Sequence, residues 1–312
     1  FSFLRIKGWA TIEKNLFLGL GGAYGLQLTS NTGSKTTSIL NNIFYQTKPG
    51  IGLQDGSYAN TFNIDKNHFI ENSSDDIPTA TTPTTAGPAT VLNVDQATTG
   101  SYVATFTNNL IFGNNATQTD SSLLHIWDPG NISTPSVSIT ANNFIANNAT
   151  YFIYNLLPST DTDVSATGNY WDTIVTTEID DLIHDSKDDA SLNTVSYLSS
   201  YLGSPATSAP LSVIQGISVS GGSGGSATVA WTPGPESDIS GYRVYWDTTT
   251  QNIPYTNSQD CPLGSSCVIS GITTGTTYFT VTSLKVGHDG SNDMVEGYES
   301  YYGDAVSHSI TP

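Results

Sequence analysis

The first 171 residues repeat one short pattern of apolar and polar positions. An apolar residue is followed by two variable positions, an Asn, another variable position, and an aromatic or aliphatic residue. Intervals in the twenties between these Asn residues fit one coil of a parallel β-helix, which needs three short strands and three turns. Longer intervals predict insertions. The Asn residues are Asn15, Asn42, Asn67, Asn109, Asn142 and Asn169, at intervals of 27, 25, 42, 33 and 27 residues.

The Asn of each repeat has a structural explanation. We expect the apolar residues on either side of a turn to point into the coil, with the Asn at the bend. Asn tolerates the left-handed backbone conformation that a sharp corner needs. Asn side chains on successive coils can also form a hydrogen-bonded ladder parallel to the axis.

The pattern changes after residue 171. Residues 177–184 have the apolar spacing of a short helix, with Thr177 and Asp180 as a capping pair, and this helix would cover the last coil. Further on, strands of five to eight residues have alternating apolar and polar positions and are separated by turns of Gly, Pro, Ser and Asp. This pattern is typical of an antiparallel sandwich. The sequence therefore predicts an all-β chain: a parallel β-helix with its cap over residues 1–204, then a linker and a sandwich over residues 205–312.

Composition narrows the range of partners. The chain has nine Lys and Arg residues and 27 Asp and Glu residues, which gives a formal net charge of −18. Charged residues make up 12% of the chain. Such a negative field repels nucleic acid and anionic lipid, so we expect neither as a partner. No apolar run approaches the roughly 20 residues that span a bilayer. Phe1 opens a strand-like alternation rather than a signal peptide.

The two cysteines, Cys261 and Cys267, are six positions apart. Pro262 and Gly264 between them allow the chain to fold back, so we expect a loop disulfide formed in an oxidising compartment. Two separate thiols are the alternative. Zinc is disfavoured because no His lies near the pair and the spacing is not that of a zinc site.

Two parts of the chain resemble known families. Residues 1 to about 203 resemble the right-handed parallel β-helix repeats of secreted bacterial proteins, and Gly168–Trp171 with the Asp-rich residues 185–189 is similar to the carboxyl end of such domains. Residues 211–312 resemble fibronectin type III, with Trp231 at the position of its core Trp. The resemblance implies an extracellular or cell-surface protein. It says little about function, because β-helices host lyases, glycosidases, esterases and adhesins alike.

Motifs with catalytic associations lack the residues that catalysis requires. Residues 5–7, Arg-Ile-Lys, match the substrate-binding motif of polygalacturonases, but the paired aspartates that precede it in that family have no counterpart in this sequence. Lyases of this fold use Arg or Lys as base, whereas Arg5 and Arg243 are far apart and the lysines are scattered. Residues 221–225 have the spacing of a nucleophile elbow, but their glycines predict a hairpin. We therefore expect no catalytic site.

Other side chains are candidates for binding. Calcium is the one cofactor suggested, by two acidic runs that do not complete a twelve-residue calcium loop; hydrogen-bonded turns are the alternative. The calcium candidates are Asp185, Asp188, Asp189, Asp289 and Asp293. Aromatic residues that could contact a glycan are Trp9, Trp127, Tyr301 and Tyr302, with residues 151–154 on the same face as the first two. Core packing is the alternative for these aromatic residues.

Three hypotheses for function follow. The first is a non-catalytic extracellular structural or adhesive surface protein, a subunit of a larger assembly whose partners are copies of itself or other surface proteins. The second is a polysaccharide-degrading lyase or glycoside hydrolase, and the third is a polysaccharide-binding module. Residues 1–6 enter as an uncapped apolar strand, so we expect the first coil to pack on upstream coils or, head to tail, on a neighbouring copy, as in a filament.

Overall fold

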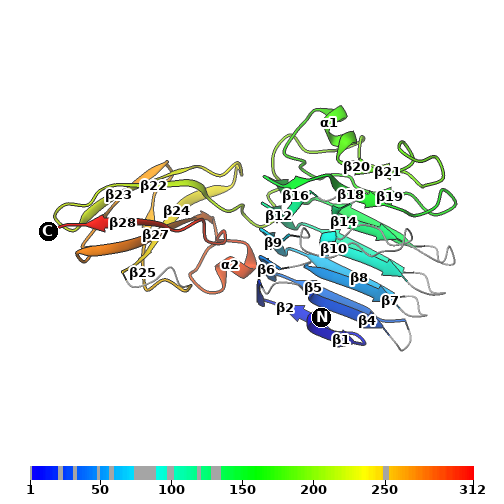
Figure 1. The fold of residues 1–312 in the computed structure, drawn as a ribbon, viewed down its shortest axis with the longest axis horizontal. Helices are drawn as coiled ribbons and strands as arrows, with labels where there is room; N and C mark the ends of the chain where they lie inside the picture. The colour runs from blue at the N-terminus through cyan, green and yellow to red at the C-terminus, as the bar shows by residue number, and fades with distance from the viewer. Residues whose placement is uncertain are drawn as a thin grey trace. The chain divides into compact units, whose positions relative to one another are not determined.

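A computed structural model of the chain shows two compact units, residues 1–209 and residues 210–312. Strands dominate both units, and the described helices are α1 (Thr176–Asp181) and α2 (Asp293–Glu296) (Figure 1). The predicted all-β class is confirmed. The structure describes residues 2–19, 24–30, 34–47, 50–55, 60–73, 89–96, 102–117, 121–127, 135–248 and 253–312.

The first unit is a parallel β-helix built from three long sheets, and every strand pairs in parallel with the strand one coil away. The first sheet contains β1 (Ser2–Lys7), β4 (Tyr24–Ser30), β7 (Ile51–Asp55), β10 (Ala89–Gln96), β14 (Ser122–Trp127), β18 (Tyr151–Asn155) and β20 (Ile183–His184). The second contains β2 (Thr11–Glu13), β5 (Thr36–Leu40), β8 (Asn60–Asp65), β11 (Tyr102–Thr107), β15 (Ser136–Thr140), β19 (Val164–Ser165) and β21 (Val195–Ser196). The third contains β3 (Leu16–Leu18), β6 (Ile43–Tyr45), β9 (His68–Ile70), β12 (Leu110–Phe112) and β16 (Asn143–Ile145). The short strands β13 (Asn115–Ala116) and β17 (Asn148–Ala149) form a fourth parallel pair.

Alternation along each strand separates the core of the β-helix from its surface. In the second sheet the register stacks Ile39, Ile64, Phe106 and Ile139 on one another, all of them buried, while their neighbours along the strand face outward. Burying one such side chain contributes about 1.5–3 kcal/mol. The core is therefore a set of apolar columns that run parallel to the axis of the coil.

Aromatic rings form one of these columns in the third sheet. Phe17 stacks on Phe44 at a centroid separation of 4.6 Å, and Phe44 stacks on Phe69 at 5.0 Å. At the other end of the column Phe144 stacks on Trp171 at 4.9 Å. These rings are the last position of the repeated sequence pattern, which explains why that position is aromatic or aliphatic.

The Asn ladder predicted from the repeats is present. From Asn42 to Asn169, each ladder Asn side chain accepts two hydrogen bonds from the Asn one coil earlier: Asn67 donates its backbone N–H at 2.9 Å and its Nδ2 at 3.1 Å to Asn109 Oδ1. Asn109 in turn donates to Asn142 Oδ1 at 2.8 Å and 3.0 Å. The same paired geometry joins the ladder from Asn15 to Asn169.

The sequence predicted a left-handed backbone conformation at the ladder Asn. In the structure, the residue before each ladder Asn has this conformation instead. Lys14, Asn41, Lys66, Asn108 and Ala141 have φ between 52° and 57°. The preceding residue turns the corner with its side chain away from the coil, so its type varies. The Asn that follows directs its amide into the coil, where it is needed for hydrogen bonding.

A second ladder, which was not predicted from the sequence, lies at the next corner. Thr47 donates its backbone N–H to Asn72 Oδ1 at 2.7 Å, Asn72 donates to Asn114 Oδ1 at 3.0 Å, and Asn114 donates to Asn147 Oδ1 at 3.0 Å. Its members follow the first ladder by five residues in each coil. That constant offset is a signal in the sequence that could have identified the second corner.

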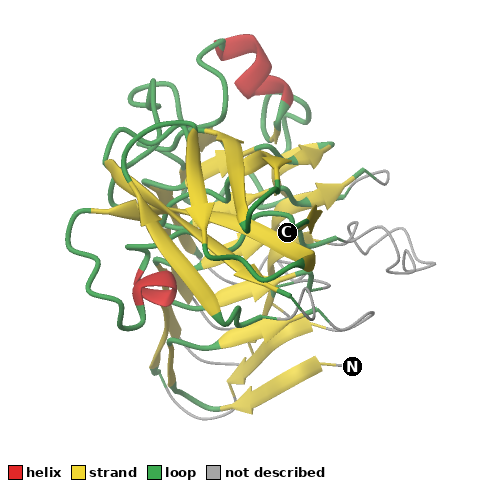
Figure 2. Ribbon diagram, turned by 90° about the vertical axis from the view of Figure 1, so that its left-hand side faces the viewer, coloured by secondary structure: helices red, strands yellow, loops and turns green. Residues whose placement is uncertain are grey.

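The end of the β-helix differs in detail from its prediction. The helix α1 ends at Asp181, and Ile183 instead pairs with Ile153 of β18 to extend the first sheet. The predicted capping pair is wrong, because the N-cap is Val175 without a side-chain hydrogen bond. Figure 2 shows α1 at the end of the stack farthest from β1.

Residues 205–209, which the sequence suggests are part of a linker, pack on the β-helix. The Ala206 backbone N–H donates to Asn143 Oδ1 at 2.7 Å, and Asn143 Nδ2 donates to the Ala206 carbonyl at 3.1 Å. Ala206 and Ala209 are buried. Because Asn143 is itself fully buried, this contact ties the end of the unit to its third sheet.

The second unit is an antiparallel sandwich. Trp231 packs on Tyr242 at a centroid separation of 5.0 Å in its core. Residues 221–226 form the predicted hairpin, with the Gly222 N–H donating to the Ser226 carbonyl at 2.9 Å, so they are not a strand-to-helix elbow. One sheet contains β22 (Gln215–Gly221), β23 (Ser226–Thr232) and β26 (Ser266–Ser270). The other contains β25 (Asn257–Cys261), β24 (Ile239–Asp247), β27 (Gly275–Lys285) and β28 (Val306–Ile310).

Candidate ligand-binding face

One outward-facing row of the first sheet collects polar and aromatic side chains. Leu124 and Ile153 point into the core, so the residues that follow them, His125 and Tyr154, point outward. Strand register extends this row along the axis of the coil. The row consists of Arg5, Gln27, Gly52, Asn93, His125, Tyr154 and His184.

Five rings on this face contact one another, and we call them the ring platform: His125, Trp127, Tyr151, Tyr154 and His184. Tyr154 and His184 stack at a centroid separation of 4.4 Å and an interplanar angle of 12°. Tyr151 lies 5.2 Å from Tyr154 and 5.4 Å from His184. His125 lies 5.8 Å from Tyr154 and 6.5 Å from Trp127. His125 is 3% exposed and lies beneath the surface of the platform, whereas the other four rings are half-buried and partly open to solvent.

The imidazole of His125, at the centre of the platform, is uncharged near neutral pH. Burial lowers the pKa of His125 to about 4, so this imidazole is neutral there. Its Nδ1 lies 3.1 Å from Asn93 Oδ1. His184 Nδ1 lies 3.6 Å from a carboxylate oxygen of Asp188, which joins the platform to the turn behind β20.

Neither Arg5 nor Lys187 is placed to assist elimination chemistry at the platform. Arg5 shares the row, but five strand-to-strand steps separate it from Tyr154, or about 24 Å at 4.8 Å per step. Lys187 is held elsewhere, because its ammonium group contacts Asp180 and lies 5.0 Å from the centroid of the Tyr197 ring. The arrangement provides stacking surfaces and neutral hydrogen-bonding groups.

The four predicted glycan contacts lie in different places. Trp127 is in the platform, whereas Trp9 is 64% exposed on the first coil, where Lys35 Nζ lies 6.0 Å from its ring centroid. Tyr302 is half-buried in the second unit. Tyr301 is 2% exposed, which excludes it as a contact in the folded domain. His125 and His184 were not selected from sequence, although each lies about one coil from Tyr154 in the chain.

A second aromatic group lies on the outer face of the four-stranded sheet. The Tyr302 ring is 5.1 Å from that of Tyr245 and 5.4 Å from that of Tyr255. Beneath it Tyr245 donates to Glu299 at 2.7 Å, and Arg243 donates to Glu299 at 3.1 Å. Burial raises the pKa of Glu299, against the effect of these partners. These polar groups hydrogen-bond to one another, so the cluster holds residues 299–302 against the sheet.

The first acidic run that the sequence suggests for calcium is a hydrogen-bonded turn in the structure. Asp185 accepts the N–H groups of Lys187 at 2.9 Å and Val195 at 2.8 Å. Asp188 accepts that of Asp185, and Asp189 accepts that of Ser191. These bonds use both carboxylate oxygens of Asp185 and one oxygen each of Asp188 and Asp189.

The second acidic run is also occupied by backbone contacts. Asp293 accepts the N–H groups of Asp289 at 3.0 Å and Gly290 at 2.6 Å, and Asp289 accepts that of Ser291 at 2.8 Å. Within the described ranges, no three His, Cys, Asp or Glu side chains are grouped to hold a metal ion. Calcium binding at these two runs stays a prediction.

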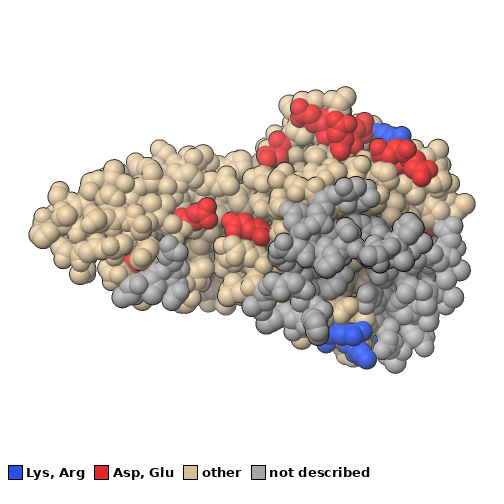
Figure 3. Space-filling view, viewed as in Figure 1, with Lys and Arg blue, Asp and Glu red and all other residues tan. Residues whose placement is uncertain are grey.

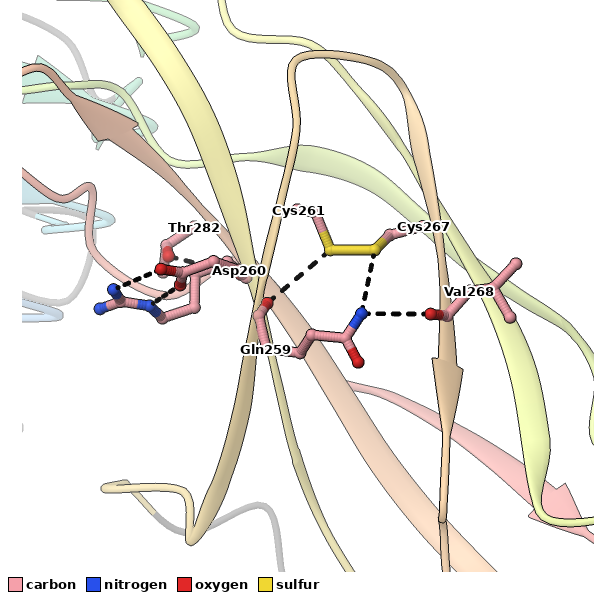
Figure 4. The surroundings of a disulfide bond; sticks show 7 residues. Gln259, Asp260, Cys261, Cys267, Val268 and Thr282 are labelled. Carbon is pink, nitrogen blue, oxygen red and sulfur yellow. Dashed lines mark hydrogen bonds and ion pairs between the residues drawn. A yellow bond between two sulfur atoms is a disulfide. The ribbon is translucent and has the colours of Figure 1, made fainter.

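A disulfide joins Cys261 and Cys267 across the sandwich (Figure 4). Cys261 ends β25 in the four-stranded sheet and Cys267 lies in β26 of the three-stranded sheet, so the bond connects two sheets rather than closing a surface loop alone. Gln259 Nε2 donates to the Val268 carbonyl at 3.2 Å beside it. Both joined strands lie at sheet edges, where backbone pairing is incomplete.

Comparison with known proteins agrees with the fold of the second unit. Residues 212–294 match the family model of the fibronectin type III domain. The second unit contains a fibronectin type III domain. No curated protein matches the chain in sequence. In the part of the chain that the structure describes, no helix is long and apolar enough to cross a membrane.

Two solved structures are similar over about a third of the chain. The chicken CNTN1 FN1–FN3 domains are 14% identical, with 33% of each chain covered and a TM-score of 0.27. The spore cortex lytic enzyme SleM of Clostridium perfringens is 17% identical, with 33% of this chain and 29% of that chain covered and a TM-score of 0.23. This chain therefore spans about a third of either structure, and TM-scores this low do not establish a shared fold.

Proposed function

We propose that this protein is a non-catalytic extracellular adhesive scaffold that binds polysaccharide on the ring platform. The observation that carries the proposal is a connected group of five rings on the adjacent strands β14, β18 and β20, four of which are partly exposed. Aromatic faces stack on the apolar faces of sugar rings, while Tyr hydroxyls and imidazole nitrogens can bond sugar hydroxyls.

The direction of the platform favours a polymer over a single sugar. His125, Tyr154 and His184 lie in one row that runs along the axis of the coil, and neighbouring strands in the row are about 4.8 Å apart. An extended sugar chain along this row would contact several coils at once, and linked contacts increase the overall affinity without strengthening any one of them.

Binding without cleavage agrees with the electrostatics of the face. The central imidazole of His125 is neutral, and Arg5 lies about 24 Å from Tyr154. A lyase on this face would need a cation beside the base to stabilise the developing negative charge. A glycosidase would need two carboxylates on opposite sides of the sugar, whereas the acidic residues that interact with His184 in the described part of the chain, Asp188 and Asp189, are neighbours in one turn.

The extracellular part of the proposal rests on the second unit. Disulfides persist in oxidising compartments, and the Cys261–Cys267 bond joins two edge strands that each pair on one side only. The fibronectin type III match agrees with such a location.

Polysaccharide binding can be tested with the intact chain and a panel of pectin, alginate, glucan and chitin oligosaccharides, by calorimetry and by co-sedimentation with the polymers. We expect at least one polymer to bind and the Tyr154→Ala variant to bind it about tenfold more weakly, since one stacking ring contributes roughly 1 kcal/mol or more. Tyr298→Ala is the matched control, because Tyr298 is 40% exposed and lies in the other unit.

The same reactions should be analysed for new reducing ends and unsaturated products. We expect neither. Turnover that persists through purification and is lost with Asp188→Asn would replace the binding proposal with catalysis. Equal binding by Tyr154→Ala and Tyr298→Ala would show that the ring platform is not the binding face.

A further inference from the structure

We infer that the ring platform selects polysaccharides by charge, and that its preferred ligand is a polymer of amino sugars whose amines are free and protonated. The inference rests on the proposed binding of polysaccharide and names the class of sugar that is bound. Two features of the described residues carry it. The rings have faces that attract cations, and carboxylates lie at the edge of the platform.

The carboxylates belong to the turn that follows β20. Asp188 Oδ2 lies 3.6 Å from His184 Nδ1, and the His184 ring stacks on Tyr154 at 4.4 Å. The Asp188 side chain is 44% exposed, and its Oδ1 accepts no hydrogen bond within the described residues. Asp189 is exposed, and hydrogen bonds from Ser191 hold the pKa of its carboxyl group below the usual range. A ligand on the rings would therefore lie close to negative charge.

The rings themselves favour a cationic ligand. The π-electrons make each face of a Tyr or Trp ring negative, and an ammonium group within about 6 Å of the ring centre is attracted to it. Trp127, Tyr151 and Tyr154 provide such rings, and each is partly exposed. Burial lowers the pKa of His125 to about 4, so this imidazole adds no positive charge that would oppose an amine near neutral pH.

The chain holds one of its own ammonium groups with the same kind of partners. Lys187 Nζ lies 5.0 Å from the centroid of the Tyr197 ring and also contacts the carboxylate of Asp180. A protonated amino sugar carries an equivalent ammonium group. Tyr154 and Asp188, joined through the His184 ring, offer that group a ring face and a carboxylate on the platform.

The distribution of charge along the β-helix disfavours an acidic sugar at this position. Figure 3 shows acidic side chains gathered at the α1 end of the β-helix, the end at which β20 lies, and a basic group at the β1 end. Arg5, the basic residue of the row, is about 24 Å from Tyr154. A polyuronate on the platform would bring its carboxylates towards Asp188 and Asp189, whereas a protonated amino sugar brings the opposite charge.

Two oligosaccharides with the same backbone and length test the inference. One is an oligomer of N-acetylglucosamine, which is neutral, and the other is its deacetylated form, whose amines are protonated in mildly acidic buffer. Calorimetry on the full chain measures both, with an oligogalacturonate as the anionic comparison. We expect the deacetylated oligomer to bind about tenfold more tightly than the acetylated one, and the oligogalacturonate to bind most weakly. Added salt should reduce these differences.

Two variants locate the preference for amines. Asp188→Asn removes one carboxylate but keeps an oxygen that can accept the backbone N–H of Asp185, so the turn is retained. We expect it to reduce the ratio of the two affinities severalfold. Glu13→Gln is the matched control, because Glu13 is exposed on β2 of the second sheet and its loss changes the net charge by the same amount. Its ratio should equal that of the wild type, and circular dichroism checks that both variants fold.

The outcomes separate this inference from the proposed function. Equal binding of the acetylated and deacetylated oligomers would overturn the preference for amines and leave polysaccharide binding in place, as would binding of a uronate or glucan in their stead. A chain that binds no polysaccharide would remove the proposed function as well. Equal ratios for Asp188→Asn and Glu13→Gln would show that the net charge of the chain attracts the amines, and this result would also overturn the inference.

Discussion

Replacing one ladder residue, Asn109→Ala, tests whether the Asn ladder stabilises the β-helix. Asn109 is fully buried. Its Oδ1 accepts the backbone N–H of Asn67 at 2.9 Å and its Nδ2 at 3.1 Å. Its own Nδ2 donates to the Ile64 carbonyl at 3.0 Å and to Asn142 Oδ1 at 3.0 Å. Alanine removes all four bonds and keeps the backbone contact to Asn142.

The expected loss follows from what remains buried. The Asn67 N–H loses its acceptor inside the coil, and a stranded buried donor costs about 1–3 kcal/mol. Of the groups in the other three bonds, Asn67 Nδ2 still donates to the Ile39 carbonyl and Asn142 Oδ1 still accepts the backbone N–H of residue 109, so we assign these three bonds about 2 kcal/mol together. The free energy of unfolding should fall by about 4 kcal/mol, a large part of the roughly 5–15 kcal/mol typical of a domain.

Urea unfolding followed by circular dichroism measures the loss, with hydrogen exchange by mass spectrometry to locate it. The two units can unfold separately, so the β-helix transition is fitted alone. Exchange should accelerate first in the peptides that contain residues 60–73 and 102–117, because coils depend on their neighbours.

Asn148→Ala is the matched control for this experiment. Asn148 is exposed, and its Nδ2 makes one bond, to Asn115 Oδ1 at 2.9 Å. We expect a loss of about 0.5 kcal/mol or less there. Equal losses for Asn109→Ala and Asn148→Ala would refute the reasoning, because burial of the ladder would then contribute nothing.

Two further predictions concern the disulfide and pH. Replacing Cys261 and Cys267 by Ser should lower the stability of the sandwich by about 2 kcal/mol in urea unfolding, since the closed ring is short; a larger loss would show that the link between the sheets matters more than ring closure. The pKa of His125 is about 4 in the folded chain, against 6.5 for a His that is open to water. The unfolded chain therefore takes up the proton first, so stability is full above pH 6.5 and falls by up to about 3 kcal/mol as the pH drops to 4. His125→Phe should remove this part of the pH dependence in urea midpoints, and an unchanged slope would contradict it.

The repeated sequence pattern was sufficient to predict the β-helix and its ladder. Period and residue type act together there: a buried amide at each corner and an apolar residue two positions later, as in Asn42 and Phe44, recur once per coil. The fibronectin type III domain was equally visible, because its alternating strands and core residue Trp231 are local features. These signals are read within one coil or one strand.

The corner conformation and the end of the β-helix depended on contacts between coils. Lys14 and Ala141 adopt the same left-handed turn although their side chains are chemically unlike, because the ladder Asn that follows each of them sets the corner. Ile183 lies in a stretch with helical spacing, yet it pairs with Ile153 and extends the sheet. Pairing with an existing sheet edge outweighs the weak helix propensity of a few residues.

The ring platform was the part of the candidate site that sequence could not assemble. Trp127 and the tyrosines at 151 and 154 were visible as aromatic residues, but their neighbours in space come from strands about one coil away along the chain. Register alone brings His125 and His184 to either side of Tyr154, since a parallel β-helix stacks residues that are one coil apart. Sequence identifies the residue types, but the lengths of the insertions between strands decide which of them meet.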